Sequence, residues 1–284
     1  MMNRFLATAM MLLALLMLPG QVSAQDNPLY QKIQALDWKR SPALGAIAGK
    51  AAIRLDGGLR FLDAHNTNQY LTLLGNLPQT DSFTVAANDL RWFSVFTFMA
   101  EGYVKDDETI DPDALLATLK QNNVQSQPER KQRGLPALYL EGWFIAPRYD
   151  SQTKRLEWAT LLRDDAGQNS VNFSTNLLGR SGHMNVILVS DPQNLASDMV
   201  QFKTALGQFE FLSGERYSEW RQGDKIAEYG LSALVVGGAA AVATKKGLWA
   251  ALGGFIAAAW KILAGLAIAI GAGLKSLFKS KSTP

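Results

Sequence analysis

Ser181 and His183 are a serine and a histidine that lie close together in the sequence, which raises the question of a nucleophile activated by a base. They belong to the glycine-containing segment Gly179-Arg180-Ser181-Gly182-His183. No strand–turn–helix pattern surrounds the serine, and side chains two positions apart on a strand point the same way without forming a bonded pair by default. We therefore interpret the segment as a turn, with a catalytic serine as the less favoured alternative.

Clustered carboxylates are the second group that could do chemistry, as general acids and bases. They occur in Asp106-Asp107-Glu108 and in Asp164-Asp165. Acidic residues in turn sequences are usually solvated, and this is the interpretation we favour. The alternative is an envelope enzyme in which Asp106 or Asp165 is the catalytic carboxylate.

The composition gives little support to cofactor or metal chemistry. The 284 residues include no cysteine and two histidines, His65 and His183, which excludes zinc–cysteine sites and iron–sulfur clusters and leaves few ligands for other transition metals. No glycine-rich phosphate-binding loop follows a strand. The formal net charge of +3 gives no general reason to bind nucleic acid. We expect no metal, no cofactor and no nucleic acid partner.

Aromatic residues gather in the segment 143–158, at Trp143, Phe144, Tyr149 and Trp158. If this segment is a β-hairpin, Trp143 and Trp158 can stack across the two strands. The alternative is that Trp143, Tyr149 and Trp158 form a face that binds a protein partner, because aromatic residues are enriched at such interfaces. These three residues are the candidate interaction face.

The N-terminal residues 1–24 predict a cleaved secretory signal. Arg4 precedes an apolar run, 5–18, that is shorter than the about 20 residues needed to cross a bilayer. Pro19-Gly20 ends the run, and Val22-Ser23-Ala24 offers small residues to a signal peptidase. We expect export to the bacterial periplasm, with an uncleaved anchor as the alternative.

The C-terminal residues 224–284 predict a membrane anchor. Two apolar runs, 226–244 and 247–274, flank Lys245-Lys246, and we expect them to form a two-helix hairpin, with one span and a surface-lying helix as the alternative. Lys261 interrupts the second run. A lysine near the bilayer centre costs about 2.5–3.5 kcal/mol, so it either snorkels or meets a partner inside the membrane. The expected location is the inner membrane, with the main domain in the periplasm.

Residues 25–223 predict one exported α+β domain, in which helices cover an antiparallel sheet. Apolar and β-branched residues predict strands at Leu138–Ile145, Leu156–Leu162, Val171–Leu177 and Met184–Val189. Their short connections imply antiparallel neighbours. Asp191-Pro192 starts a helix to about Leu206, whose apolar residues recur every three to four positions and should cover the dry face of the sheet.

Two further segments of this domain carry local signals. Ala51–Leu55 and Leu59–Leu62 flank Asp56-Gly57-Gly58, which predicts a β-hairpin. Gln121–Gly134 is polar and contains Pro128, which predicts an exposed loop.

The aromatic segment also resembles a known family. Residues 142–150 (Gly-Trp-Phe-Ile-Ala-Pro-Arg-Tyr-Asp) and 154–159 (Lys-Arg-Leu-Glu-Trp-Ala) are similar to the uncharacterised bacterial membrane-anchored family called domain of unknown function 2167, as are residues 229–231, 237–239 and 246–248. The resemblance covers most of the chain that follows the signal and includes the layout of signal, exported domain and C-terminal anchor. It implies no activity, cofactor or catalytic residue.

These patterns together favour a membrane-anchored envelope protein without enzymatic activity, acting in the periplasm as a protein-interaction or tethering module. Its expected partners are the lipid bilayer and a membrane or envelope protein. Two alternatives stay open: an envelope enzyme that uses carboxylates, and an accessory subunit of a membrane transport complex.

Overall fold

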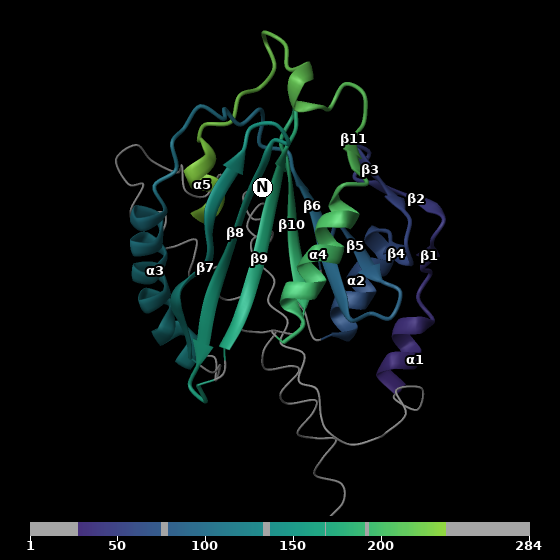
Figure 1. The fold of residues 1–284 in the computed structure, drawn as a ribbon, viewed down its shortest axis with the longest axis horizontal. Helices are drawn as coiled ribbons and strands as arrows, with labels where there is room; N and C mark the ends of the chain where they lie inside the picture. The colour runs from purple at the N-terminus through teal and green to yellow at the C-terminus, as the bar shows by residue number, and fades with distance from the viewer. Residues whose placement is uncertain (1–27, 75–78, 133–136, 168, 191–192, 237–284) are drawn as a thin grey trace, which may run out of the picture.

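The computed structural model describes residues 28–74, 79–132, 137–167, 169–190 and 193–236 (Figure 1). The strands are β1 (Lys39–Arg40), β2 (Ala43–Ile47), β3 (Ala51–Leu55), β4 (Leu59–Leu62), β5 (Ser82–Ala87), β6 (Trp92–Met99), β7 (Leu138–Asp150), β8 (Arg155–Asp164), β9 (Asn169–Leu178), β10 (His183–Ser190) and β11 (Phe209–Phe211). The helices are α1 (Pro28–Gln34), α2 (Ala64–Leu73), α3 (Pro112–Gln132), α4 (Leu195–Leu206), α5 (Leu231–Val236) and the 3₁₀ helix η2 (Tyr217–Glu219). The predicted signal (1–24) and the predicted anchor from residue 237 onward, Lys261 included, lie outside the described residues.

Eight strands form the larger sheet, in the order β1-β4-β5-β6-β10-β9-β8-β7, and three strands form a smaller sheet, β11-β3-β2. All of the strand pairs are antiparallel. The four strands predicted between Leu138 and Val189 are β7 to β10, which lie side by side in chain order. The α+β class and the antiparallel sheet are thus confirmed.

The hairpin predicted for Ala51–Leu62 is wrong. Gly57 and Gly58 do have the positive φ of a tight turn, 64° and 83°. However, β3 pairs with β2 and β11, whereas β4 pairs with β1 and β5. Ile53 of β3 and Phe61 of β4 are buried in the same core cluster. The two strands therefore belong to different sheets and contribute to one core, an arrangement that the turn sequence alone does not distinguish from a hairpin.

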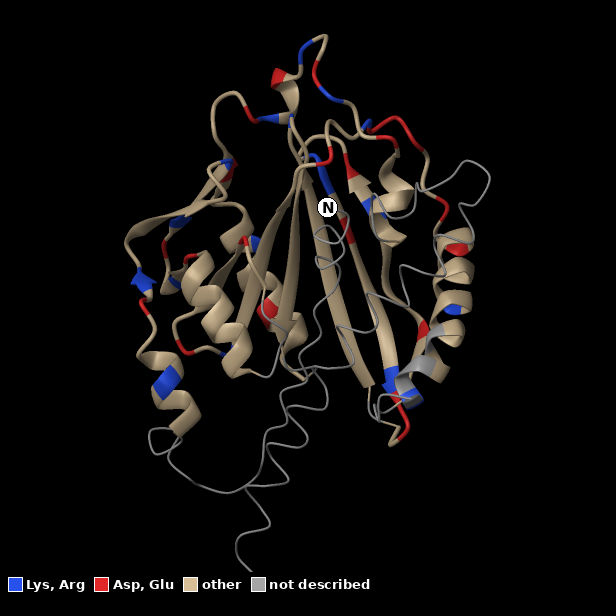
Figure 2. Ribbon diagram, turned by 180° about the vertical axis from the view of Figure 1, so that it is seen from behind, with Lys and Arg blue, Asp and Glu red and all other residues tan. Residues whose placement is uncertain are grey.

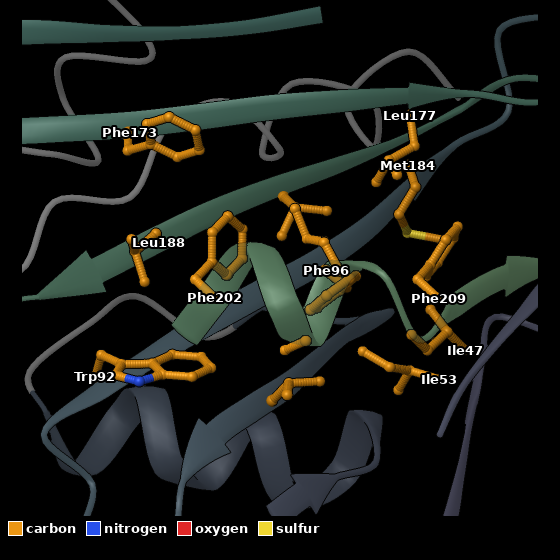
Figure 3. Close-up of a cluster of buried hydrophobic side chains, with 14 of the residues drawn as sticks. Ile47, Ile53, Trp92, Phe96, Phe173, Leu177, Met184, Leu188, Phe202 and Phe209 are labelled. Carbon is orange, nitrogen blue, oxygen red and sulfur yellow. The ribbon is translucent and has the colours of Figure 1, made fainter. Parts of the chain in front are cut away.

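One face of the larger sheet is covered by α4 and the smaller sheet. Phe202 of α4 makes edge-on ring contacts with Trp92 of β6 and Phe173 of β9, with ring centroids 6.1 and 5.8 Å apart. Figure 3 shows these side chains together in the core. The predicted helix up to Leu206 is thus present as α4 and covers the dry face of the sheet as expected.

The opposite face is covered in two places. The helices α1 and α2 pack on one half, with Tyr70 of α2 against Phe93 of β6 at a ring-centroid distance of 5.1 Å. The helices α3 and α5 pack on the half formed by β7 and β8, where Leu156, Trp158 and Leu162 of β8 are buried. Each face of the sheet therefore has its own apolar cover.

The loop predicted for Gln121–Gly134 is wrong over most of its length, because α3 continues to Gln132 and includes Pro128. Its polar side chains bind the backbone of β7, the edge strand of the larger sheet. Asn123 donates from Nδ2 to the Leu138 carbonyl at 2.8 Å and accepts from the Leu140 N–H at 3.0 Å. These bonds satisfy backbone groups that an edge strand leaves unpaired. This tertiary contact compensates for the weak helical preference of the segment.

The predicted boundary at residue 223 and the predicted helix from residue 226 differ from the structure. Tyr103 donates its backbone N–H to the Lys225 carbonyl at 2.8 Å, and Ala227 donates to the Tyr103 carbonyl at 2.9 Å, so this stretch is extended and bound to the domain. Helix α5 begins at Leu231 and buries Leu231 and Leu234 in the core. Among the described residues, no helix is both long enough and apolar enough to span a bilayer.

The packing of α4 predicts a large effect of one substitution on stability. Phe202 is 1% exposed, and Phe202→Ala should lower the free energy of unfolding by about 3–5 kcal/mol, because it removes buried ring contacts and leaves a cavity. Val200 lies on the same helix with 68% exposure, so Val200→Ala should change it by about 0.5 kcal/mol or less. Urea unfolding of both variants tests this. Equal effects would show that α4 does not cover the sheet in this way.

Candidate functional site

The segments that contain Asp106 and Ser181 meet at one end of the larger sheet, at the top of Figure 1, whereas Asp164-Asp165 lies at the opposite end of β8. The β7–β8 turn reaches the end of β9 through a bond from the Leu178 N–H to the Lys154 carbonyl, 2.9 Å. The β9–β10 turn is bonded to the loop after β11, from the Arg180 N–H to the Glu215 carbonyl at 2.9 Å. Figure 2 shows many charged residues in the loops at this end. We take it as the candidate site because several residues considered for chemistry lie there.

Asp106 forms the centre of a hydrogen-bonded cluster at this end. Its Oδ2 accepts from the Tyr149 hydroxyl and from Lys154 Nζ, both at 2.7 Å, and its Oδ1 accepts from the Tyr217 hydroxyl at 2.9 Å. Burial alone would raise the pKa of Asp106, but the hydrogen bonds from Lys154, Tyr149 and Tyr217 outweigh it and the pKa is lowered. Asp106 is therefore an ionised acceptor that joins the loop after β6 to the β7–β8 hairpin and to η2.

This geometry does not favour the hypothesis that Asp106 or Asp165 acts as a catalytic carboxylate. A general acid needs a raised pKa and a free position facing a substrate, whereas Asp106 has a lowered pKa and three donors on its two oxygens. Asp165 also makes structural bonds, because it accepts from the Ala137 N–H at 3.0 Å and the Tyr139 hydroxyl at 3.3 Å. The arrangement suits both residues to holding loops in place.

Ser181 lies on the β9–β10 turn and His183 is the first residue of β10, and the two do not bond to each other. The Ser181 hydroxyl donates to the Glu215 carboxylate, which also binds Lys50. His183 is buried, and this burial lowers its pKa to about 4, so the ring is neutral at pH 7. The nearest carboxylate to its Nδ1 is that of Glu101, at 4.0 Å. The structure thus agrees with the interpretation of this segment as a turn.

Beside this turn, charged groups pair with each other around a hollow of about 420 Å³. Arg180 donates to both carboxylate oxygens of Asp224, at 2.7 and 2.8 Å. The hydrogen bond from Arg180 is the main cause that lowers the pKa of Asp224, to about 2. The hollow is also lined by Ser181 and Glu215, which are bonded to each other. Most charged groups that line the hollow are therefore already paired with charged groups of the protein itself.

The aromatic residues predicted as an interaction face do not form one exposed surface. Trp158 is 2% exposed and lies in the core beneath α3, and Trp143 packs against the same cluster while donating its indole N–H to the Pro112 carbonyl at 3.0 Å. Trp143 is opposite Thr160 and not Trp158, and the ring contacts of the described residues do not include a pair of these two tryptophans. Tyr149 binds Asp106. The exposed aromatic side chain of this stretch is Phe144, at 51%.

On the α4 side of the same hairpin, Glu157 is held between two cations. Its Oε2 accepts from Lys203 Nζ of α4 at 2.9 Å and from Arg148 Nη2 of β7 at 3.3 Å. These residues and Arg155 line a second hollow of about 420 Å³. In the described part of the chain, no group of three or more histidine, aspartate or glutamate side chains has the geometry of a metal site.

Sequence reasoning missed several residues of this end. Tyr217 lies 111 positions from Asp106, and Lys203 lies 46 positions from Glu157. No local pattern relates residues so far apart, and only the folded sheet brings them together. Arg148 and Arg155 stand in the segments that carry the family resemblance, but the sequence assigns no role to them.

A family model matches residues 39–271 of the chain. The chain belongs to this family, DUF2167, whose description is protein of unknown function. The resemblance stated from the aromatic segment is thereby confirmed for the family. No curated protein matches the chain.

Among solved structures, the chain is similar to the solution structure of cyanobacterial PsbP (CyanoP) from Synechocystis sp. PCC 6803. The identity is 12% and the TM-score is 0.35, with 62% of this chain and 94% of the other chain covered. Similarity of this degree says nothing about a shared function.

The Asp106 cluster predicts a pH-dependent contribution to stability. Asp106→Asn should lower the free energy of unfolding at pH 7 by about 2 kcal/mol, because hydrogen bonds to a charged acceptor are replaced by weaker ones. The pKa of Asp106 is lowered in the folded state, so its contribution is fully present above the ordinary carboxyl pKa of 3.8 and is lost as the pH falls through the lowered value.

Urea unfolding at pH 7 and at a series of pH values below 4 measures this difference. The matched control is Asp107→Asn, because Asp107 is the adjacent residue and is exposed. A difference between wild type and Asp106→Asn that stays constant as the pH falls would contradict the assigned role of the Asp106 charge.

Proposed function

We propose that this protein is a membrane-tethered protein of the bacterial envelope whose exported domain acts by binding a partner. The observation that carries the proposal is the packing of α5 into the domain. Leu231, Leu234, Val235 and Val236 are buried, and the Ser232 N–H donates to Glu108 Oε2 at 3.0 Å. Residues 237–274 follow directly and are almost entirely apolar. A domain core thus leads into an anchor-like sequence without a polar linker.

The two ends of the sequence support the proposed location. Residues 1–24 have the pattern of a secretory signal, and residues 237–284 contain the apolar run 247–274 and the lysines of an inner-membrane anchor. On this proposal the domain lies in the periplasm and the lipid bilayer is its first partner.

The side chains at the candidate site favour binding over catalysis. Asp106, Ser181 and Asp224 are each bonded to neighbouring side chains that hold loops together. A nucleophile or general base needs a free position facing a substrate. We therefore propose a tethering or interaction module, with a membrane or envelope protein as its second partner.

Membrane fractionation tests the tether. The full chain should stay in the membrane pellet after an alkaline carbonate wash, because apolar helices in a bilayer are not released by charge changes. Leu266→Arg combined with Ile270→Arg should move most of the protein to the soluble fraction, since each arginine costs about 2.5–3.5 kcal/mol within a span. Thr283→Arg, in the polar tail, is the control. Release of the unaltered chain by carbonate would overturn the proposed anchor.

Lys261 tests the protein partner within the membrane. If Lys261 contacts a partner there, Lys261→Leu should reduce the size of the detergent-extracted complex, measured by native gel and crosslinking. Lys279→Leu, in the tail, should leave it unchanged. An unaltered complex in Lys261→Leu would show that the lysine snorkels and makes no such contact.

A further inference from the structure

The hollow on the α4 side of the β7–β8 hairpin is lined by charged side chains that the proposed membrane tether does not require. Its volume of about 420 Å³ falls within the range of about 300–1,000 Å³ that is usual for small-molecule sites. Arg148, Arg155 and Lys203 line it together with Glu157 and Asp150. Three cationic side chains against two carboxylates leave one positive charge in excess.

A β-bulge places Arg148 at this hollow. Ile145 is opposite Ala159 and Arg148 is opposite Glu157, so β7 advances three residues where β8 advances two. Without the extra residue, Pro147 would stand opposite Glu157 and Arg148 would point to the other face. The bulge thus brings the guanidinium of Arg148 to the face where α4 carries Lys203.

The two carboxylates of the hollow are already engaged. Glu157 is 8% exposed, and its Oε2 accepts from both Arg148 and Lys203. Asp150 Oδ1 accepts from the backbone N–H groups of Gln152 and Thr153, at 2.9 and 3.2 Å, and so closes the turn. Neither carboxylate forms an ion pair with Arg155.

Arg155 is held in place but forms no ion pair within the described residues, and the Asp150 carboxylate acts on it only at longer range. Its Nη2 donates to the Leu206 carbonyl at the end of α4, at 3.0 Å, which fixes the position of the guanidinium. None of the ion pairs in the described part of the chain, which join nitrogen and oxygen atoms within 4.0 Å, includes Arg155. A fixed guanidinium with unused donors matches the planar oxygens of a phosphate or carboxylate group.

We propose that this hollow binds a small organic anion through a phosphate or carboxylate group. Arg155 is the anchor, and Arg148 and Lys203 turn from Glu157 to the ligand. The remaining volume, which Thr153 also lines, takes the uncharged part of the molecule. The site goes beyond the proposed tether and does not depend on where the protein is located.

Isothermal titration calorimetry on the purified full chain in a neutral detergent at low salt tests the site. The probes are inorganic phosphate, glycerol 3-phosphate and succinate. At least one organic probe, a short-chain anionic lipid included, should bind, and Arg155→Gln should weaken this binding about tenfold or more, because a charge-assisted hydrogen bond is lost. Arg148→Gln provides a second variant whose side chain is 63% exposed, so its folding is not at risk. It should weaken binding in the same direction.

Two further variants sharpen the test. Arg163→Gln is the matched control, because Arg163 lies on the same strand, pairs with Glu141 and lines no part of the hollow; it should bind like the unaltered chain. Glu157→Gln should strengthen binding several-fold, because it removes the internal anion that competes for Arg148 and Lys203.

The source of the anionic group is distinguished by short-chain lipids used as monomers. Arg155-dependent binding of short-chain phosphatidylglycerol, without binding of glycerol 3-phosphate or succinate, assigns the site to a lipid headgroup, and the reverse assigns it to a soluble anion. Short-chain phosphatidylcholine controls for the acyl chains. The proposal is overturned if no probe binds the unaltered chain, or if Arg155→Gln and Arg148→Gln bind as well as Arg163→Gln.

Discussion

The eight-stranded sheet is apolar on both faces, and most of the structure follows from the need to cover it twice. On β10, Leu188 faces the core under α4, whereas its neighbour Ile187 faces the core under α2. Successive residues of a strand point to opposite faces, so one layer of helices cannot bury both. The small sheet and α4 cover one face, and α1, α2, α3 and α5 cover the other. Because both faces must be covered, β3 pairs within the small sheet and not with β4, and α5 packs into the domain core.

At the end of the sheet where the turns meet, hydrogen bonds and ion pairs of charged side chains join the loops, beside the stacked rings of Tyr103 and Tyr217. Asp106 joins three segments, Glu215 binds both Lys50 and Ser181, and Arg180 binds Asp224 through two bonds. Carboxylates that resemble catalytic groups in the sequence are thus the means by which the loops are held. Among the described residues Arg155 forms no such ion pair, and for this reason we propose it as the anchor of a binding site.

Local patterns predicted the parts of the fold in which burial alternates regularly. The strands β7 to β10 and the helix α4 were expected because their apolar residues recur with the period of a strand or a helix. The hairpin at Gly57-Gly58 was wrong because a turn sequence does not say whether its strands pair. The loop expected at Pro128 was wrong because Asn123 and Gln127 bond to the edge of β7. Of the candidate interaction face, Trp158 is buried beneath the same helix, whereas Trp143 and Tyr149 are partly buried against the same core.

The sequence alone determined the antiparallel α+β character of the domain, its family, and the exclusion of cysteine chemistry, because these depend on composition, periodicity and local motifs. The tertiary structure decided which polar residues meet. Asp106 and Tyr217, or Glu157 and Lys203, come together only when strands and helices far apart in the chain pack on one sheet. The bulge before Arg148 is also a tertiary feature, since it is defined by the register against β8. Register sets the face on which each side chain lies, and local sequence does not encode it.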